Sequence, residues 1–200
     1  MCGIVGYVGR DQATPILLEG LSKLEYRGYD SAGVAVYDDR EGSLAVHKSK
    51  GRLQVLSDLL DGGAAVHGCV GVGHTRWATH GVPDDRNAHP HTTERLSLVH
   101  NGIIENDEEL RAEVLARGAV LHSETDTEVA AHLLDRLYAE SGDPVAALFA
   151  AADRLRGSFA FAVLFCDRPG EIYAIRRDSP LIVAQSPHGT VLASDIPAIL

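Results

Sequence analysis

Three short apolar runs constrain the fold most, because they lack the regular alternation of polar and apolar residues found in a half-exposed strand. They are CGIVGYV at residues 2–8, CVGVGHT at 69–75 and LSLVH at 96–100. Short apolar runs with β-branched residues predict strands that are covered on both faces. A sheet built from such strands needs a packed layer on each side.

Amphipathic segments that can supply those layers lie between the apolar runs. We predict helices at residues 13–24, 53–60, 105–117, 125–138 and 144–155. The third predicted helix stops at Gly118, which is a usual C-terminal signal. The fourth begins with Thr125 and Glu128 at the spacing of a capping box.

The remaining β segments predict antiparallel pairing. Residues 32–37 and 44–47 flank a polar turn, as in a hairpin. After Gly157, four β-rich runs predict an antiparallel meander, at 159–165, 172–176, 181–184 and 191–193. We therefore predict an α+β fold with layers of helix outside two stacked, largely antiparallel sheets.

Composition sets the broad class of protein. The 200 residues fit one domain, residues 1–200, and the final segment at 195–200 resembles the first turn of an element cut short, so we expect truncation at the C-terminus. The formal charge of -10 disfavours nucleic acid and anionic membranes as partners. No apolar run is long enough to span a bilayer, and Arg10 follows the N-terminal apolar stretch too soon for a secretory signal. These features predict a cytoplasmic protein.

The second residue is a candidate nucleophile. Aminopeptidases remove an initiator methionine before a small residue, so loss of Met1 would leave Cys2 with a free α-amine. Such an amine has a pKa of roughly 7.7 to 8.0 and can take the thiol proton near neutral pH. A bare Met-Cys start would otherwise indicate only a small residue opening a buried strand. Cys69 and Cys166 lie in apolar runs, and we expect them to be inert core residues.

Five motifs carry a family resemblance that covers essentially the whole chain. They are MCGIVG at residues 1–6, YRGYDSAG at 26–33, HTRWATHG at 74–81, VHNGIIEN at 99–106 and SETDTE at 123–128. Together they resemble the class II glutamine amidotransferases, and among these the glutaminase domains of the glutamine–fructose-6-phosphate aminotransferase family. The resemblance implies the N-terminal-nucleophile hydrolase fold, a four-layer α/β/β/α sandwich.

The resemblance also implies which residues carry out the chemistry. Cys2 attacks the side-chain amide of glutamine, while the Asn101 side chain and the Gly102 backbone N–H stabilise the oxyanion. The motif outweighs the ordinary interpretation of Asn-Gly, which is a hairpin turn. We expect this pair to follow the strand at 96–100.

The two ends of the substrate are assigned in the same way. Arg76 is the candidate for the α-carboxylate, with Thr79 and His80 at the same end, and Asp126 is the candidate for the α-ammonium. Without the motifs, Arg76 would be interpreted as a solvated surface charge and Asp126 as a helix cap or a partner of the helix dipole.

Three further positions are expected to support the site. We expect Trp77 to form part of a lid that closes over the substrate. The alternative is that it packs in the core. Arg27 and Gly28 are expected to support the nucleophile loop, although an ion pair between Arg27 and Asp30 is nearly as well supported.

The predicted reaction is hydrolysis of L-glutamine to glutamate and ammonia through a γ-glutamyl thioester on Cys2. It requires no cofactor. The histidines, especially His74, His80, His89 and His91, match no zinc signature, so we expect no metal. The resemblance implies isomerase domains in the full-length chain, which would use the ammonia to convert fructose 6-phosphate to glucosamine 6-phosphate as a homodimer.

Other interpretations of the sequence remain open. Within the family, they are the glutaminase domain of an amidophosphoribosyltransferase or of an asparagine synthetase. Outside it, they are a metal-dependent hydrolase that uses the histidines and a catalytically inactive module that binds glutamine. Tyr29 and the SETDTE segment favour the hexosamine-forming enzyme within the family.

Overall fold

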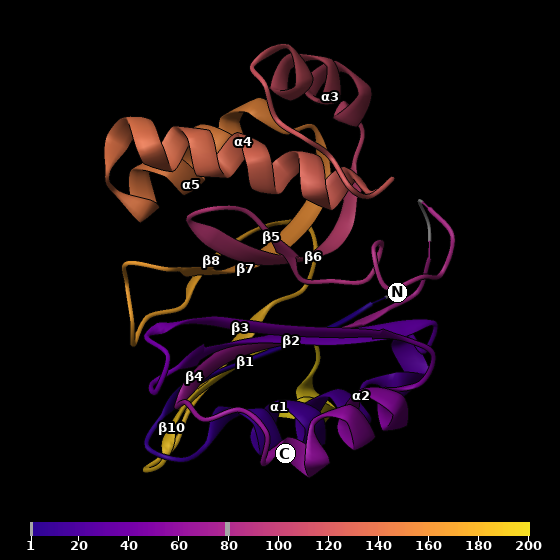
Figure 1. The fold of residues 1–200 in the computed structure, drawn as a ribbon, viewed down its shortest axis with the longest axis vertical. Helices are drawn as coiled ribbons and strands as arrows, with labels where there is room; N and C mark the ends of the chain where they lie inside the picture. Colours follow the sequence, from indigo (N-terminus) through magenta and orange to yellow (C-terminus); the bar gives the residue numbers. More distant parts are fainter. Residues whose placement is uncertain (1, 79–80) are drawn as a thin grey trace.

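Two antiparallel sheets, stacked face to face, form the centre of the molecule in a computed structural model that describes residues 2–78 and 81–200 (Figure 1). The larger sheet has the strand order β3 (Ser43–Lys50), β2 (Ser31–Asp38), β4 (Val70–Arg76), β1 (Gly3–Gly9), β10 (Gly189–Ala193), β9 (Ile182–Gln185). The smaller sheet has the order β5 (His91–Thr92), β6 (Leu96–Ile104), β7 (Gly157–Phe165), β8 (Tyr173–Arg177).

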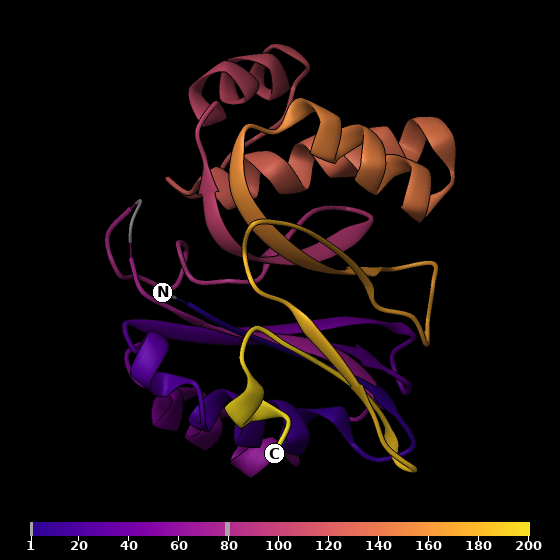
Figure 2. The same cartoon turned by 180° about the vertical axis from the view of Figure 1, so that it is seen from behind.

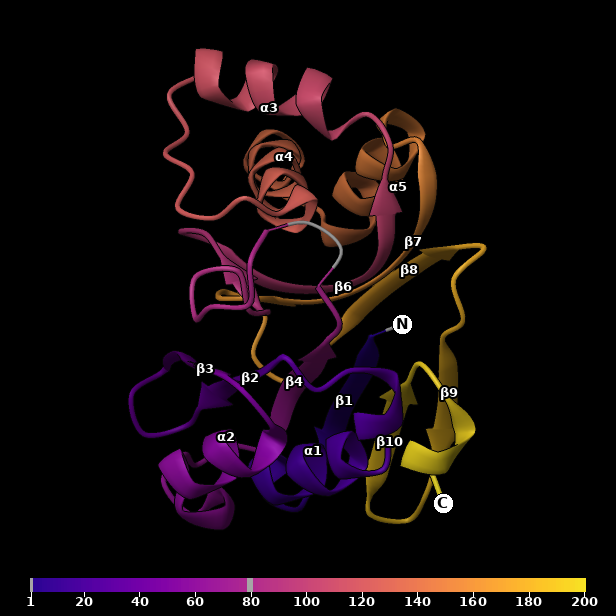
Figure 3. The ribbon, with the colours of Figure 1, turned by 90° about the vertical axis from the view of Figure 1, so that its right-hand side faces the viewer.

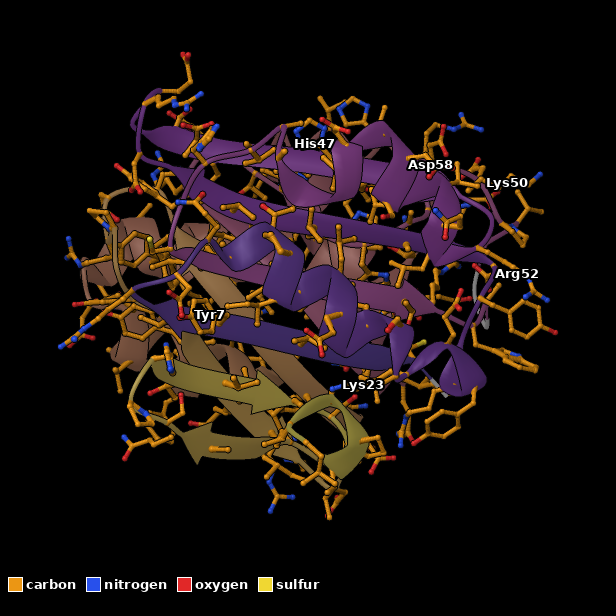
Figure 4. The ribbon with its side chains drawn as sticks, turned by 90° about the horizontal axis from the view of Figure 1, so that it is seen from below. Tyr7, Lys23, His47, Lys50, Arg52 and Asp58 are labelled. Carbon is orange, nitrogen blue, oxygen red and sulfur yellow. The ribbon has the colours of Figure 1, made fainter. Side chains whose placement is uncertain are left out.

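Helices cover the outer face of each sheet, so the molecule has four layers (Figures 1 and 2). On the larger sheet lie α1 (Ala13–Ser22) and α2 (Leu53–Leu59), and Figure 4 looks directly onto this layer. On the smaller sheet lie α3 (Asp107–Ala116), α4 (Asp126–Ser141) and α5 (Pro144–Arg154). Short 3-10 turns occur at Glu25–Arg27, Asp61–Gly63 and Ile196–Ala198. The predicted arrangement of helices outside two stacked sheets is confirmed.

The alternating glycines and valines of β4 explain how one strand is packed from both sides. Gly71 and Gly73 face α1, where an added Cβ would lie 2.9 Å from a leucine side chain in each case. Val72 points the opposite way, into the apolar cluster between the sheets. Every residue of β4 is buried, because the helix approaches one face closely while the second sheet covers the other.

The predicted meander after Gly157 is wrong. β7 pairs with β8 in the smaller sheet, whereas β9 pairs with β10 in the larger one, where β10 also pairs with β1. The chain therefore crosses between the sheets after β8. All four strands are antiparallel to their neighbours, and local pairing signals cannot distinguish a continuous meander from two hairpins placed in different sheets.

Two further expectations need correction. Cys69 and Cys166 lie just outside β4 and β7 and are half-buried, with thiols near the carbonyl oxygens of Arg10 and Glu94. Neither is a core residue. The strand predicted at 96–100 continues to Ile104.

The start of α4 resembles the predicted capping box only in part. The Thr125 hydroxyl accepts a hydrogen bond from the Glu128 N–H at 3.2 Å, which satisfies one of the free donors at the helix start. The Glu128 carboxylate accepts from the backbone N–H groups of His122 and Ser123 instead of that of Thr125. The segment before α4 is thereby held against the helix.

Within the described part of the chain, none of the helices has the length and apolar character needed to cross a bilayer.

Candidate functional site

Strand alternation brings side chains from the larger sheet to one end of the interface between the sheets. In β1 and β4, the even-numbered residues Ile4 and Val72 belong to the apolar cluster between the sheets. The same alternation places Cys2, His74 and Arg76 on that face. Figure 3 shows the end of β4 beside the start of β1, beneath β6.

Strand β6 supplies the opposite wall by the same rule. Val99 packs between the sheets, and Asn101 has the same parity, so its side chain faces β1 and β4. His100 points the other way, where its ring contacts Thr127 of α4. Asn101 and Cys2 therefore meet across the interface between the sheets.

The Cys2 sulfur lies against the backbone of Trp77. It is 3.3 Å from the Trp77 nitrogen, which donates to it, and 3.7 Å from the Trp77 oxygen. Burial raises the pKa of the Cys2 thiol above its ordinary value, while the Trp77 N–H and the Arg76 charge act in the opposite direction. The thiol therefore needs a nearby base to react at neutral pH.

The Cys2 carbonyl oxygen is held from two sides. It accepts hydrogen bonds from Arg27 Nε at 3.1 Å and from Asn101 Nδ2 at 3.0 Å. Arg27 also forms an ion pair with Asp195 at 2.6 Å, while the Asp30 carboxylate lies beside Arg76. Gly28 lies against the Arg76 backbone, where an added Cβ would be 2.7 Å from the carbonyl group.

Asn101 and Gly102 lie inside β6 and not after it. They pair with Ala160 and Phe159 of β7. Gly102 has a φ of +131°, and an added Cβ would lie 2.0 Å from the Ser158 carbonyl oxygen. The site is therefore built on a distorted strand that accepts only glycine at this position.

Arg76 is buried at the end of β4, and its guanidinium is directed at the loop that follows. One nitrogen donates to the Gly81 oxygen at 3.2 Å, and another lies 3.5 Å from the Val82 oxygen. The Asp30 carboxylate is 4.0 Å from Arg76 and also accepts from the backbone N–H of Ala78. Asp30 thus holds both the strand end and the start of the loop.

Asp126 lies in the first turn of α4, and its carboxylate is oriented by neighbours. One oxygen accepts from the Ile104 N–H at 2.9 Å, and the other is 3.3 Å from the Thr127 hydroxyl. Ring nitrogens of His89 and His100 each lie 2.8 Å from that hydroxyl. A hydroxyl that donates to Asp126 has only lone pairs left, so both rings donate to it.

The buried imidazoles near α4 are uncharged. Burial lowers the pKa of His74 to about 3, and burial together with neighbouring positive groups lowers the pKa values of His89 and His91 well below 6.5. In the part of the chain that the structure describes, no group of three or more potential ligands is arranged to hold a metal ion.

Trp77 is 47% exposed, so it does not pack in the core. Its ring stands edge-on to Tyr29, with centroids 5.5 Å apart, and Arg52 lies over the other aromatic ring of the pair. The tryptophan therefore stands at the rim of the site beside the nucleophile.

The described sequence-predicted residues other than Gly28 converge on two adjoining pockets that share Cys2, Trp77 and Gly102. One pocket is completed by residues from β4, from the segment before β5, from β6 and from the start of α4, namely Arg76, His89, His100, Thr125, Asp126 and Thr127. The other is completed by Arg27, Asn101, Ile103, Glu105, Ser158, Ser179 and Pro180. Thr79 and His80, predicted at the substrate carboxylate, lie outside the described residues.

Sequence reasoning missed three contributors to the site. Thr127 lies in the SETDTE motif but was assigned no role, and Asp195 lies in none of the five motifs; the partners of both come from distant parts of the chain. His74 was considered only as a metal ligand, yet its even-numbered position in β4 beside Arg76 places it on the site face. Strand parity would have placed it on the site face, although not in contact with Asn101.

A wider hollow of about 490 Å³ lies on the outer surface near α3 and α4. Its arginines are paired with carboxylates: Arg95 with Asp135, and both Arg117 and Arg136 with Glu113. No feature of this hollow matches the convergence of polar groups around Cys2.

Sequence comparison connects this site to known proteins. A family model described as a glutamine amidotransferase domain matches residues 74–200. Two similar proteins, from Symbiobacterium thermophilum and Clostridium tetani, are 55% and 51% identical and are both named glutamine–fructose-6-phosphate aminotransferase [isomerizing]. Each match covers 100% of this chain but only 32% of the relative's length.

Structure comparison identifies the same architecture in a solved protein. The glutamine phosphoribosylpyrophosphate amidotransferase of B. subtilis, complexed with ADP and GMP, superposes with a TM-score of 0.83 at 27% identity. The superposition covers 99% of this chain and 43% of that chain. This likeness confirms the predicted four-layer fold of N-terminal-nucleophile hydrolases.

Proposed function

Because the chain belongs to the glutamine amidotransferase domain family, we propose that it hydrolyses L-glutamine to glutamate and ammonia through Cys2. One observation carries the proposal: the Cys2 sulfur, an amide donor and two oppositely charged side chains line adjoining pockets. Acyl transfer from an amino acid amide needs each of these groups.

Cys2 is the nucleophile, and its own α-amine is the base once Met1 has been removed. The amine takes the thiol proton, the sulfur bonds to the amide carbon of glutamine, and the C–N bond breaks. The departing nitrogen receives the proton and leaves as ammonia. Water then cleaves the γ-glutamyl thioester and releases glutamate. The raised pKa of the buried thiol supports the need for a base beside it.

Asn101 Nδ2 and the Gly102 N–H stabilise the oxyanion that forms in both steps. The Asn101 amide nitrogen lies beside the nucleophile residue, 3.0 Å from its carbonyl oxygen, and one of its two N–H groups can serve the substrate. Donors fixed in a buried site act strongly, because little reorganisation is needed when charge develops.

Arg76 and Asp126 bind the α-carboxylate and the α-ammonium of the substrate. The Arg76 guanidinium donates to carbonyl oxygens of the following loop, and a carboxylate is a stronger partner for the same donors. Thr79 and His80 would assist at that end, and Trp77 at the rim would close over the substrate.

The activity of the whole protein is a further part of the proposal. The chain spans 32% of the length of its relatives, so isomerase domains would follow it in a full-length homodimer. There, ammonia would convert fructose 6-phosphate to glucosamine 6-phosphate. We also propose a cytoplasmic location, since a reducing compartment keeps a free catalytic thiol reduced.

The amidophosphoribosyltransferase alternative is less well supported than the aminotransferase. Identity to the solved phosphoribosylpyrophosphate enzyme is 27%, against 55% to the Symbiobacterium aminotransferase. The metal-dependent alternative is weakened by the contacts of His89 and His91, whose ring nitrogens bond to threonine hydroxyls.

The test is glutamate release by the purified chain, with the mass of its first residue measured on the same sample. We expect turnover only in protein that has lost Met1. Cys2→Ala should lower turnover by about 10⁴-fold or more, because no other group can form the thioester. A peptide tag placed before Met1 should have the same effect, since it leaves the Cys2 nitrogen as an amide.

Cys69→Ala is the matched control, because it removes another half-buried thiol that lies outside both pockets. It should keep full turnover, and the same tag at the C-terminus should also be harmless. Undiminished glutamate release by Cys2→Ala or by the N-terminally tagged chain would refute the mechanism.

A further inference from the structure

The orientation of the Asn101 amide follows from its neighbours. The Cys2 carbonyl oxygen can only accept, so the side-chain nitrogen of Asn101 must face it, at 3.0 Å. The amide oxygen of Asn101 then faces the His74 ring, 3.1 Å from Nε2. This orientation exposes one further N–H of Asn101, for which the described residues supply no partner.

The same reasoning fixes the tautomer of His74. Its Nε2 lies 3.0 Å from the His100 carbonyl oxygen and 3.1 Å from the Asn101 amide oxygen. Both atoms are acceptors, so Nε2 carries a hydrogen shared between them. Burial lowers the pKa of His74 to about 3, so the ring stays neutral, and its Nδ1 has no hydrogen-bond partner within the described residues.

His74 is also unable to turn away. Its side chain is fully buried, and the ring packs on His89 with centroids 4.1 Å apart and an interplanar angle of 30°. Its bond to the His100 oxygen ties β4 to β6 at the residue before Asn101. The donor therefore belongs to a rigid element of the opposite sheet.

We propose that His74 is a positioning residue, whose Nε2–H locks the Asn101 amide so that its free N–H faces the oxyanion and its oxygen faces away. This inference rests on the proposed glutamine hydrolysis. If the amide flipped, its oxygen would meet the developing negative charge and repel it. His74 lies in the other sheet and donates to the amide oxygen of Asn101. This role differs from that of the residues that touch the substrate.

The test compares His74→Phe, which keeps a buried ring but removes the donor, with His74→Gln, whose amide can replace it. His74→Phe should lower kcat by about 10- to 100-fold, less than or equal to the loss of an oxyanion donor, while KM for glutamine stays within about twofold. His74→Gln should recover most of kcat. Alkylation of Cys2 by iodoacetamide should proceed at the parent rate in both.

A second readout isolates the oxyanion. With L-glutamate γ-semialdehyde, the Cys2 sulfur adds to the aldehyde carbon and the thiol proton ends on the former carbonyl oxygen, so that oxygen occupies the oxyanion position. Its inhibition constant should rise in His74→Phe by the same factor as kcat falls. Inhibition by glutamate, which forms no such adduct, should be unchanged.

His91→Phe is the matched control, because His91 is another buried imidazole, but its hydrogen bond goes to Thr125. It should lower stability as His74→Phe does. The inhibition constants of the semialdehyde and of glutamate should change by the same factor. The proposal is overturned if His74→Phe keeps kcat within about threefold of the parent. It is equally overturned if both variants weaken inhibition by the semialdehyde, weaken inhibition by glutamate and slow the alkylation of Cys2 by similar factors.

Crystal structures of the two His74 variants supply a readout independent of activity. The Asn101 side chain should stay within hydrogen-bond distance of the Cys2 oxygen in His74→Gln and move out of that distance in His74→Phe. A parent chain that releases no glutamate would remove the proposed function. An Asn101 amide that stays in place in His74→Phe would remove the role of His74.

Discussion

At the residue scale, the nucleophile is held through its backbone as much as through its sulfur. Two donors from different elements, Arg27 and Asn101, share the Cys2 carbonyl oxygen. Because β1 begins at Gly3, Cys2 has no ladder of strand pairs to fix it. These two side chains therefore do for Cys2 what strand pairing does for its neighbours.

Replacing Arg27 by lysine tests this. A lysine can keep the ion pair with Asp195 but has no Nε group to reach the Cys2 oxygen. We expect kcat for glutamate release to fall by about 10- to 100-fold, because an approximately 1 Å displacement of a reacting group has that effect. Steady-state kinetics with glutamine measures the loss.

Asp195→Asn separates the two contacts of Arg27. It removes the charge partner while leaving the hydrogen bond to Cys2, so kcat should stay within about threefold of the parent. If Asp195→Asn loses as much activity as Arg27→Lys, the ion pair and not the Cys2 contact is what positions the nucleophile.

Sequence motifs could predict the chemistry-bearing residues and Arg27, which donates to the Cys2 carbonyl oxygen, but not every residue that orients them. Cys2, Arg76, Asn101 and Asp126 stand in local motifs, and all four line the two adjoining pockets. The contact of His74 with Asn101 depends on how two sheets stack, which no local pattern encodes.

At the element scale, β6 carries the site because it continues through Asn101 and Gly102, a pair that outside its motif is more often a hairpin turn. Asn-Gly commonly forms a two-residue hairpin loop, which requires positive φ at both positions. Here only Gly102 has a positive φ, and β7 pairs with the strand through Ile104 and Gly157. Nine consecutive pairs with β7 outweigh the local preference for a turn.

Gly102→Ala should therefore destabilise the fold and abolish glutamate release. The added Cβ meets the Ser158 oxygen at 2.0 Å, and neither backbone can shift without breaking β6 from β7. We expect the free energy of unfolding to fall by about 3–5 kcal/mol, from backbone strain and overpacking together. Urea denaturation measures it.

Gly118→Ala is the matched control for backbone strain alone. Gly118 also has a positive φ, of +92°, but an added Cβ meets nothing within 4 Å. It should cost about 1–2 kcal/mol and leave activity intact. If both variants lose the same free energy of unfolding, the contact of the added Cβ with Ser158 does not contribute to the destabilisation of Gly102→Ala.

The path of the chain between elements was the least predictable feature. β8 and β9 are each short and amphipathic, yet they join different sheets. Their separation follows from an open edge beside β1, which β10 fills by pairing with Val5 through Gly9. The residues of β1 that pair with β10 lie more than 170 positions away in sequence, so no local pattern predicts this pairing.

At the scale of the whole molecule, the four layers bury titratable rings that a thinner fold would leave in water. His74, His89 and His91 are each at most 5% exposed. Burial lowers the pKa of His74 to about 3 and lowers those of His89 and His91 well below 6.5. In the unfolded chain each ring titrates near 6.5.

This difference predicts a loss of stability in mild acid. Because the folded pKa values are depressed, the unfolded state binds more protons below pH 6.5, and the stabilisation present above that pH declines as pH falls toward the folded values. A ring that takes up a proton only on unfolding lowers the free energy of unfolding as the pH falls below its unfolded pKa, so the three rings together should make the protein steadily less stable from pH 6 to 5.

Urea unfolding at intervals from pH 7 to 5 measures this slope, and carboxylates contribute little there because most remain ionised. His91→Gln should reduce the slope, since it removes one of the three rings. Ser49→Ala, which alters a buried group that does not titrate, should lower stability without changing the slope. A free energy of unfolding that stays constant from pH 7 to 5 would mean that the rings accept protons inside the fold, contrary to their burial between the layers.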